Sequence, residues 1–262
     1  MTKRFVFLLA IGLVIAGSVL ADDNVRAVQE KLHAGGFYQG EIDGAYSSQL
    51  SAALTRYQIR NGLPITGQLD EDTSKALGAK AGVTDKAADP AHTSSETWQR
   101  LRKGERQTLA IERRETLSPG AEETTEVAPQ SAPAATAQDA NTEQLRDYVG
   151  AFVLAGLDPK VGSETEFFAD HVQYYDQGLF DREKIRKDLQ QYAARWPERR
   201  FWLDGDVSID RQNGNRVRVT FPLRYDLRNG GKHFSGKVNK TLVLEPAGDN
   251  FQIVAVNERK SD

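Results

Sequence analysis

The sequence is poor in cysteine, histidine and methionine. Its 262 residues include no cysteine, one methionine and four histidines. Without cysteine the chain has no disulfide bond, no lipid-modified cysteine and no thiol nucleophile. Four scattered histidines leave few metal ligands, so we expect neither a metal site nor a cofactor. Because the formal net charge is only -3, we expect no nucleic-acid partner.

The first 21 residues have the pattern of an export signal. Lys3 and Arg4 give a positive start, and an almost unbroken apolar run covers residues 5–16. Val19 and Ala21 stand at the -3 and -1 positions of a cleavage before Asp22. An uncleaved membrane anchor is the alternative, but the apolar run is shorter than the roughly 20 residues of a spanning helix. The pattern therefore predicts a periplasmic protein.

Residues 22–79 predict a small all-α domain with three helices. Apolar residues at helical spacing indicate one helix that ends at Gly35 and a second from about Ser47 to Arg60. A third, short helix follows Asp70 and ends at Gly78. Two stretches of this domain repeat each other, and each is a glycine-containing turn that leads into a helix.

Residues 80–140 predict a flexible linker. The part from residue 118 to residue 140 is rich in Ala, Pro, Thr, Glu and Gln and has almost nothing large to bury. The pattern also allows a short helix at residues 97–111, which carry Trp98 and Leu101 among many charges. Because its apolar face is thin, a fraying linker helix is favoured there over a docking element.

Residues 141–258 predict an α+β domain, and residues 259–262 a tail. Asn141 and Gln144 have the spacing of a capping box at the start of a helix. A short strand at residues 172–175 and a helix between Asp181 and Pro197 follow.

The apolar period then changes from helical spacing to strict alternation. This change predicts a curved antiparallel sheet of about four long strands, at residues 201–210, 217–227, 232–245 and 251–257. Pro222 cannot donate to a strand ladder, so we expect a bulge or bend at that position.

The ordered motifs of residues 24–77 resemble the peptidoglycan-binding module of many bacterial cell-wall proteins. They are Val28-Gln29-x-x-Leu32, Gly40-x-Ile42-Asp43-Gly44-x-Tyr46, Asn61-Gly62-Leu63 and Thr73-x-x-Ala76-Leu77. The resemblance implies peptidoglycan as a partner. Ser47 and Leu50 depart from the pattern, because the family usually has Gly and Thr there. Aromatic faces stack on sugars, and polar side chains bond stem peptides. The candidate contacts are therefore Tyr38, Asp43, Tyr46, Arg56 and Gln58.

The order of elements from Thr142 to Glu258 resembles the nuclear-transport-factor-two-like superfamily, which includes ketosteroid-isomerase-like and polyketide-cyclase-like (SnoaL-like) proteins. The carriers are Tyr148-Val149-x-x-Phe152, Val172-x-Tyr174-Tyr175, Arg182-Glu183-x-Ile185 and Tyr192-x-x-x-Trp196-Pro197. The resemblance implies a cone, in which a bent sheet wraps a long helix around a pocket. The candidate pocket residues are Tyr148, His171, Tyr174, Tyr175, Asp176 and Trp196.

No catalytic residue is assigned from the sequence. The chain lacks the G-x-S-x-G and S-x-x-K motifs of serine nucleophiles, and no pair of carboxylates is singled out for glycoside hydrolysis. We therefore interpret the chain as a non-catalytic protein that tethers a ligand- or protein-binding domain to the cell wall. Two alternatives stay open: an isomerase- or dehydratase-like pocket, and a structural spacer that forms a homodimer through the C-terminal sheet.

Overall fold

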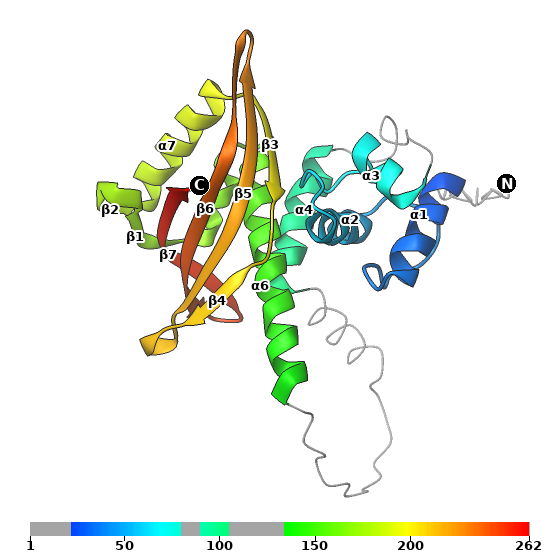
Figure 1. The fold of residues 1–262 in the computed structure, drawn as a ribbon, viewed down its shortest axis with the longest axis horizontal. Coiled ribbons are helices and arrows are strands. Elements are labelled where there is room, and N and C mark those ends of the chain that lie inside the picture. Colours follow the sequence, from blue (N-terminus) through cyan, green and yellow to red (C-terminus); the bar gives the residue numbers. More distant parts are fainter. Residues whose placement is uncertain (1–21, 80–89, 105–133, 262) are drawn as a thin grey trace, which may run out of the picture.

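The computed structural model describes residues 22–79, 90–104 and 134–261. A small helical domain and a larger sheet domain lie on opposite sides of two helices (Figure 1). The expected signal at residues 1–21 and most of the expected linker lie outside the described residues. Within these ranges, no helix is both long and apolar enough to cross a membrane.

The helical domain has the three expected helices: α1 (Asp23–Ala34), α2 (Ser48–Arg60) and α3 (Glu71–Leu77). The first amides of a helix lack partners within it, so a side chain that accepts from them stabilises the helix start. Asp22 caps α1, Ser47 caps α2 and Asp70 caps α3. Ser47 and the fully buried Leu50 thus contribute to the fold at the two positions that depart from the family pattern.

Helix α4 (Pro90–Lys103) packs against both α2 and the long helix α6 (Ala134–Leu157). The sequence favours a fraying linker helix here, and the structure shows a docking element instead. Trp98 and Leu101 are fully buried and belong to the same core as the sheet domain. A thin apolar face is sufficient, because α4 has an apolar neighbour on each side.

Helix α6 begins earlier than expected. It starts at Ala134, so Asn141 lies inside the helix and the predicted capping box of Asn141 and Gln144 is wrong. The segment before Asn141 contains several alanines, which have the highest helix propensity, and the helix extends through it. Helix α6 runs between the two domains, as Figure 1 shows.

The sheet has seven strands, which curve around α6. They are β1 (Phe168–Tyr174), β2 (Leu179–Asp181), β3 (Glu198–Leu203), β4 (Ser208–Arg211), β5 (Val217–Asn229), β6 (Lys232–Ala247) and β7 (Asn250–Lys260). The order is β2-β1-β7-β6-β5-β3, and β4 also pairs with β5. Because β1 runs parallel to β7, the sheet is mixed and not purely antiparallel as expected. The α+β class is confirmed.

The irregularity expected at Pro222 lies in the neighbouring strand. Strand β5 pairs with β6 in one unbroken register. On its other side, β3 pairs as far as Leu223, and the Asp204 amide still donates to the Pro222 carbonyl at 3.0 Å. Residues 205–207 then leave the ladder, and β4 resumes it at Thr220. The predicted strand at residues 201–210 is therefore two strands.

The helix α7 (Arg182–Arg195) begins at its predicted cap and packs against β1 and β2. The Asp181 carboxylate accepts a hydrogen bond from the Lys184 amide at 2.7 Å. Two short 3-10 turns, η1 (Ser163–Phe167) and η2 (Tyr175–Gln177), connect α6, β1 and β2.

Candidate functional sites

A buried glutamine holds each glycine turn of the helical domain. The Gln29 carboxamide accepts from the Gly44 amide at 2.8 Å, and the Gln58 carboxamide accepts from the Gly67 amide at 2.9 Å. Both glutamines are 0% exposed, and both glycines have a positive φ that side-chain-bearing residues rarely adopt. Sequence reasoning proposes Gln58 as a ligand contact and misses Gln29. The sequence signal that could have indicated their burial is a glutamine on the apolar stripe of a helix.

Two of the expected peptidoglycan contacts are tyrosines that bond to the domain itself. Tyr38 is only 3% exposed, and its hydroxyl donates to the Glu41 carbonyl at 2.8 Å. The Tyr46 hydroxyl donates to the Gly67 carbonyl at 2.9 Å and so links the first turn to the second. Burial raises the pKa of Tyr46.

Asp43 organises the first turn. Its carboxylate accepts from the Gln29 carboxamide at 2.9 Å and from the Ala45 amide at 2.8 Å. These two hydrogen bonds hold the pKa of Asp43 below its usual value. The residue is exposed, so it remains on the surface while it supports the turn.

One partly exposed aromatic pair lies on the helical domain. Phe37 and Tyr57 pack edge to face with ring centroids 5.4 Å apart. Both rings are half-buried against the domain core. Their remaining exposed surface is of the kind that stacks on sugar rings.

Arg56, the fifth expected contact, lies at the interface between the two domains. Its guanidinium donates to the Asp147 carboxylate of α6 at 2.9 Å. Nearby, Arg60 pairs with Glu143 at 2.5 Å. Ile59 packs on α6 at Gly150, where an added Cβ atom would come within 2.6 Å of the Ile59 side chain.

The helix α4 is fixed to the end of α6 through Asp158. The Trp98 indole nitrogen donates to the Asp158 carboxylate at 2.8 Å, and the Ser95 hydroxyl donates to it at 3.0 Å. The Arg102 guanidinium lies over the Phe167 ring, 4.7 Å from its centre. These contacts combine packing with buried hydrogen bonds, which are costly to break.

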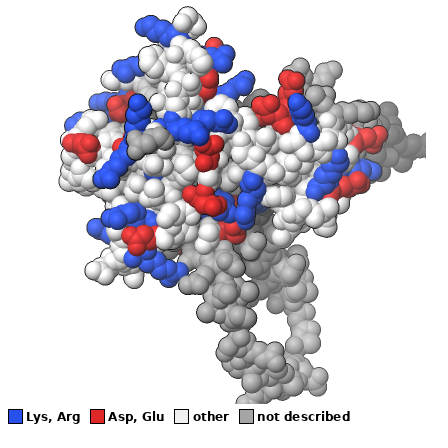
Figure 2. Space-filling model, viewed as in Figure 1, with Lys and Arg blue, Asp and Glu red and all other residues white. Residues whose placement is uncertain are grey.

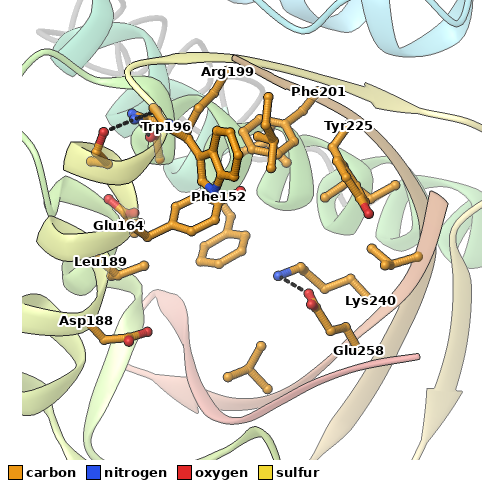
Figure 3. A pocket seen from close by; sticks show the side chains of 18 of the residues that line it. Phe152, Glu164, Asp188, Leu189, Trp196, Arg199, Phe201, Tyr225, Lys240 and Glu258 are labelled. Atoms are coloured by element: carbon orange, nitrogen blue, oxygen red, sulfur yellow. Dashed lines mark hydrogen bonds and ion pairs between the residues drawn. The ribbon is translucent and has the colours of Figure 1, made fainter. Parts of the chain in front are cut away.

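A cavity of about 540 Å³ lies in the cone. Figure 3 shows Phe152 of α6, Phe201 of β3 and Tyr225 of β5 along its lining. Helix α7 contributes Leu189 and Tyr192. This volume falls within the range of small-molecule sites, which are mostly apolar with a few polar groups.

Glu164 of η1 is a buried carboxyl group in the cavity lining. It is 9% exposed, and its Oε2 atom has no hydrogen-bond partner among the described residues. Burial raises the pKa of this carboxyl from 4.5 to about 7, although the nearby Arg199 acts in the opposite direction. Sequence reasoning misses Glu164, because one acidic residue in a polar turn carries no local signal of burial.

A charged cluster lies opposite Glu164 in the cavity (Figure 3). The Lys240 ammonium donates to the Tyr175 hydroxyl at 3.1 Å and pairs with the Glu258 carboxylate at 3.1 Å. Burial alone would lower the pKa of Lys240, but its two partners raise it. Tyr175 has a positive φ of 49°, which is uncommon for a residue with a side chain.

Three of the six expected pocket residues line this cavity: Tyr174, Tyr175 and Trp196. The other three lie elsewhere. Tyr148 is buried in the core and donates to the Phe251 carbonyl at 3.2 Å, while His171 and Asp176 are exposed. Among the described residues, no three metal-ligating side chains are grouped.

The outer face of the sheet carries mixed charges. Figure 2 shows basic and acidic side chains interspersed over the visible surface of the sheet domain. Arg216 pairs with Glu245 on the adjacent strand. Arg224 instead stacks on the Trp202 ring, 4.3 Å from its centre. An exposed ion pair such as that of Arg216 and Glu245 contributes little to stability.

Comparison with known proteins identifies the helical domain. Residues 21–77 match the family described as "Putative peptidoglycan binding domain". The chain thus carries a peptidoglycan-binding-type domain followed by a cone-shaped α+β domain. A "Localization factor PodJL" of Caulobacter vibrioides is 38% identical over 66 residues, which are 25% of this chain and 7% of that relative. The chain therefore matches only a small part of that relative.

Solved structures similar to the C-terminal part include proteins described as NTF2-like. A "Nuclear transport factor 2 (NTF2-like) superfamily protein" from Salmonella enterica serovar Typhimurium has a TM-score of 0.38 and 15% identity, over 50% of this chain and 94% of that one. A "putative dehydratase from the NTF2-like family" of Streptomyces avermitilis has a TM-score of 0.41 and 16% identity, over 48% of this chain and 99% of that one.

Proposed function

We propose that this is an exported, non-catalytic protein that binds peptidoglycan through residues 22–79 and carries the cone as a ligand-binding domain at the cell wall. The family match of residues 21–77 carries this proposal. The signal pattern of residues 1–21 supports export to the periplasm. The cavity supports a small-molecule ligand for the cone.

The contacts between the domains support a fixed orientation. A flexible tether acts by raising the effective concentration of the second domain. Here α4 packs between α2 and α6, and Arg56 pairs with Asp147 across the same interface. The peptidoglycan site and the cavity would then keep one distance and one relative direction. A ligand would be held at a defined place relative to the cell wall.

Sedimentation with purified insoluble peptidoglycan tests the attachment. We expect the mature chain from Asp22 to Asp262 to sediment with the polymer. Phe37→Ala removes half of the exposed aromatic pair and should release part of the protein into the supernatant. Phe234→Ala, an exposed aromatic of the cone, is the matched control and should sediment like the wild type. A wild-type chain that stays in the supernatant would overturn the proposal.

A second function, isomerase- or dehydratase-like catalysis, is favoured by one observation. Glu164 is a buried carboxyl with a pKa of about 7, which suits proton transfer at neutral pH. This function predicts that a bound ligand loses water, or exchanges a carbon-bound proton for deuterium in D₂O. Mass spectrometry of the recovered ligand, with Glu164→Gln as the comparison, distinguishes turnover from binding.

A further inference from the structure

The mouth and most of the lining of the cone cavity are apolar. Three partly exposed side chains contribute to the lining: Val161 at 43%, Tyr192 at 36% and Phe234 at 58%. Phe234 packs against Trp196 with ring centroids 5.2 Å apart, which brings a second aromatic ring to the mouth. When a ligand enters here, its apolar surface and that of the mouth are both removed from water, which favours binding.

The charges that line the cavity nearly balance. They are two cations and three carboxyl groups: Arg199, Lys240, Glu164, Asp188 and Glu258. With the Glu164 carboxyl protonated, two cations face two carboxylates and the sum is zero. The cavity therefore has no positive excess for an anion, and its one unbalanced charge is that of the Glu164 carboxyl, whose ionised form is disfavoured by burial.

Four of these five charged groups already have partners. Arg199 donates to the main-chain carbonyls of Trp196 at 2.8 Å and Gly156 at 3.1 Å. Lys240 and Glu258 pair with each other. Asp188 accepts from the Tyr174 hydroxyl at 2.8 Å.

The Glu164 carboxyl is the one that retains an unused acceptor. Its Oε2 atom is buried and accepts no hydrogen bond from any described residue. A buried acceptor without a partner is unfavourable, and a hydrogen bond from a ligand donor would relieve this cost. Because Glu164 lines the cavity, a ligand bound there can donate to this carboxyl group.

We propose that the cavity binds an uncharged, mainly apolar molecule that donates a hydrogen bond, from a hydroxyl or an N–H group, to the Glu164 carboxyl. This inference rests on the proposed ligand-binding role of the cone and names its ligand class. The apolar lining favours a ligand with a mainly apolar body, and the charge balance favours one without charge. Glu164 favours a ligand with a hydrogen-bond donor.

Three fluorescent probes with the same ring system test the ligand class. N-Phenyl-1-naphthylamine is neutral and has an N–H donor. Its N-methyl derivative lacks the donor, and 8-anilinonaphthalene-1-sulfonate keeps the donor but adds an anion. With the full mature chain we expect the first probe to bind most tightly. The N-methyl form should bind about three- to tenfold more weakly, the range of one neutral hydrogen bond. The sulfonate should bind more weakly than the first probe.

Variants assign the binding to the cavity and to Glu164. Leu189→Trp fills the cavity from α7 and should abolish binding, whereas Leu179→Trp alters an exposed leucine outside the lining and should not. Glu164→Leu should remove the preference for the donor probe. Glu166→Gln, an exposed neighbour in η1, should keep it. Thermal unfolding of each variant reports whether it is folded.

The outcomes separate this inference from the function on which it rests. One outcome is that Leu189→Trp abolishes binding, while neither loss of the N–H donor nor Glu164→Leu changes the affinity. This outcome overturns the inference and leaves the cone as a ligand-binding domain. Tighter binding of the sulfonate also overturns it. If no probe binds in the cavity, both the inference and the ligand-binding role of the cone fail, while peptidoglycan sedimentation judges the attachment separately.

Discussion

The main-chain amide of Ile65 donates a 2.8 Å hydrogen bond to the main-chain carbonyl of Phe201. Ile65 lies in the second turn of the helical domain, and Phe201 lies on β3, the last strand in the sheet order. The bond pairs a backbone group at an edge of the sheet with a group from the helical domain. The Phe201 side chain lines the cavity, so the helical domain is bonded directly to a cavity-lining residue.

Because α4 docks through Trp98, we expect a substitution of this residue to lower the stability of the protein strongly. Replacing this fully buried indole by alanine leaves a cavity and removes a hydrogen bond to Asp158. We expect Trp98→Ala to lower the unfolding free energy by about 3–5 kcal/mol in a urea titration. Gln99→Ala, an exposed position on the same helix, is the control and should change it by less than about 0.5 kcal/mol. Equal effects of the two substitutions would contradict the docking of α4.

The ion pair between the domains should be stronger than a surface pair. Arg56 and Asp147 are each less than one-fifth exposed, whereas Arg186 and Glu183 of α7 are 44% and 60% exposed. Double-mutant cycles with alanine should give a coupling energy of about 1–2 kcal/mol for the first pair and less than about 0.5 kcal/mol for the second. A negligible coupling at Arg56 would mean that the two domains do not share this contact in solution.

Two glycines of the helical domain allow the destabilising effects of backbone strain and of steric crowding to be compared. Gly62 and Gly67 both have φ near +60°, at 62° and 64°. An added Cβ atom meets nothing within 4 Å at Gly62, but at Gly67 it lies 2.9 Å from the Ser51 hydroxyl. Gly62→Ala should therefore lose about 1 kcal/mol of stability through backbone strain alone, and Gly67→Ala clearly more. Thermal unfolding of the two variants side by side checks the order, and a Gly62→Ala variant that is the less stable one would contradict it.

The raised pKa of Glu164 makes stability depend on pH. Its value is about 7 in the folded chain, against 4.5 for an unperturbed carboxyl, so the folded state holds this proton more tightly than the unfolded state does. The stabilising effect is complete below pH 4.5 and is lost as pH rises to about 7. This pKa difference corresponds to roughly 3 kcal/mol of unfolding free energy.

Unfolding free energies between pH 5 and pH 8 measure this effect. Glu164→Gln should flatten the decline and should be more stable than the wild type at pH 8, because the amide carries no charge to bury. Glu166→Gln, at an exposed position, should follow the wild-type curve. If the curves of the wild type and Glu164→Gln run parallel, the Glu164 carboxyl does not titrate in this range.

Local patterns of the sequence predict most of the helical domain. Aspartate and serine at helix starts, glycines in the turns and apolar residues at helical spacing all depend on neighbours within a few positions. The three helices lie where these signals place them. The same signals predict α7, with Asp181 as its cap, and the long strand β5.

Contacts between distant segments are not encoded in such patterns. Strand β1 pairs in parallel with β7, about eighty residues later in the chain, and no local period reports this pairing. The apolar face of α4 is buried because α2 and α6 both pack on it, although that face is thin. Glu164 looks like an ordinary surface residue in the sequence until the fold surrounds it.

The sequence by itself thus determined the peptidoglycan-binding-type domain, the helix α7 and the long strands of the cone, because caps, turns and apolar periods act over short distances. The tertiary structure decided that the domains share a core, that Arg56 bonds to α6, and that a carboxyl without a partner lies inside the cone. Burial, desolvation and ion pairing depend on everything that surrounds a side chain, and only the complete fold specifies those surroundings.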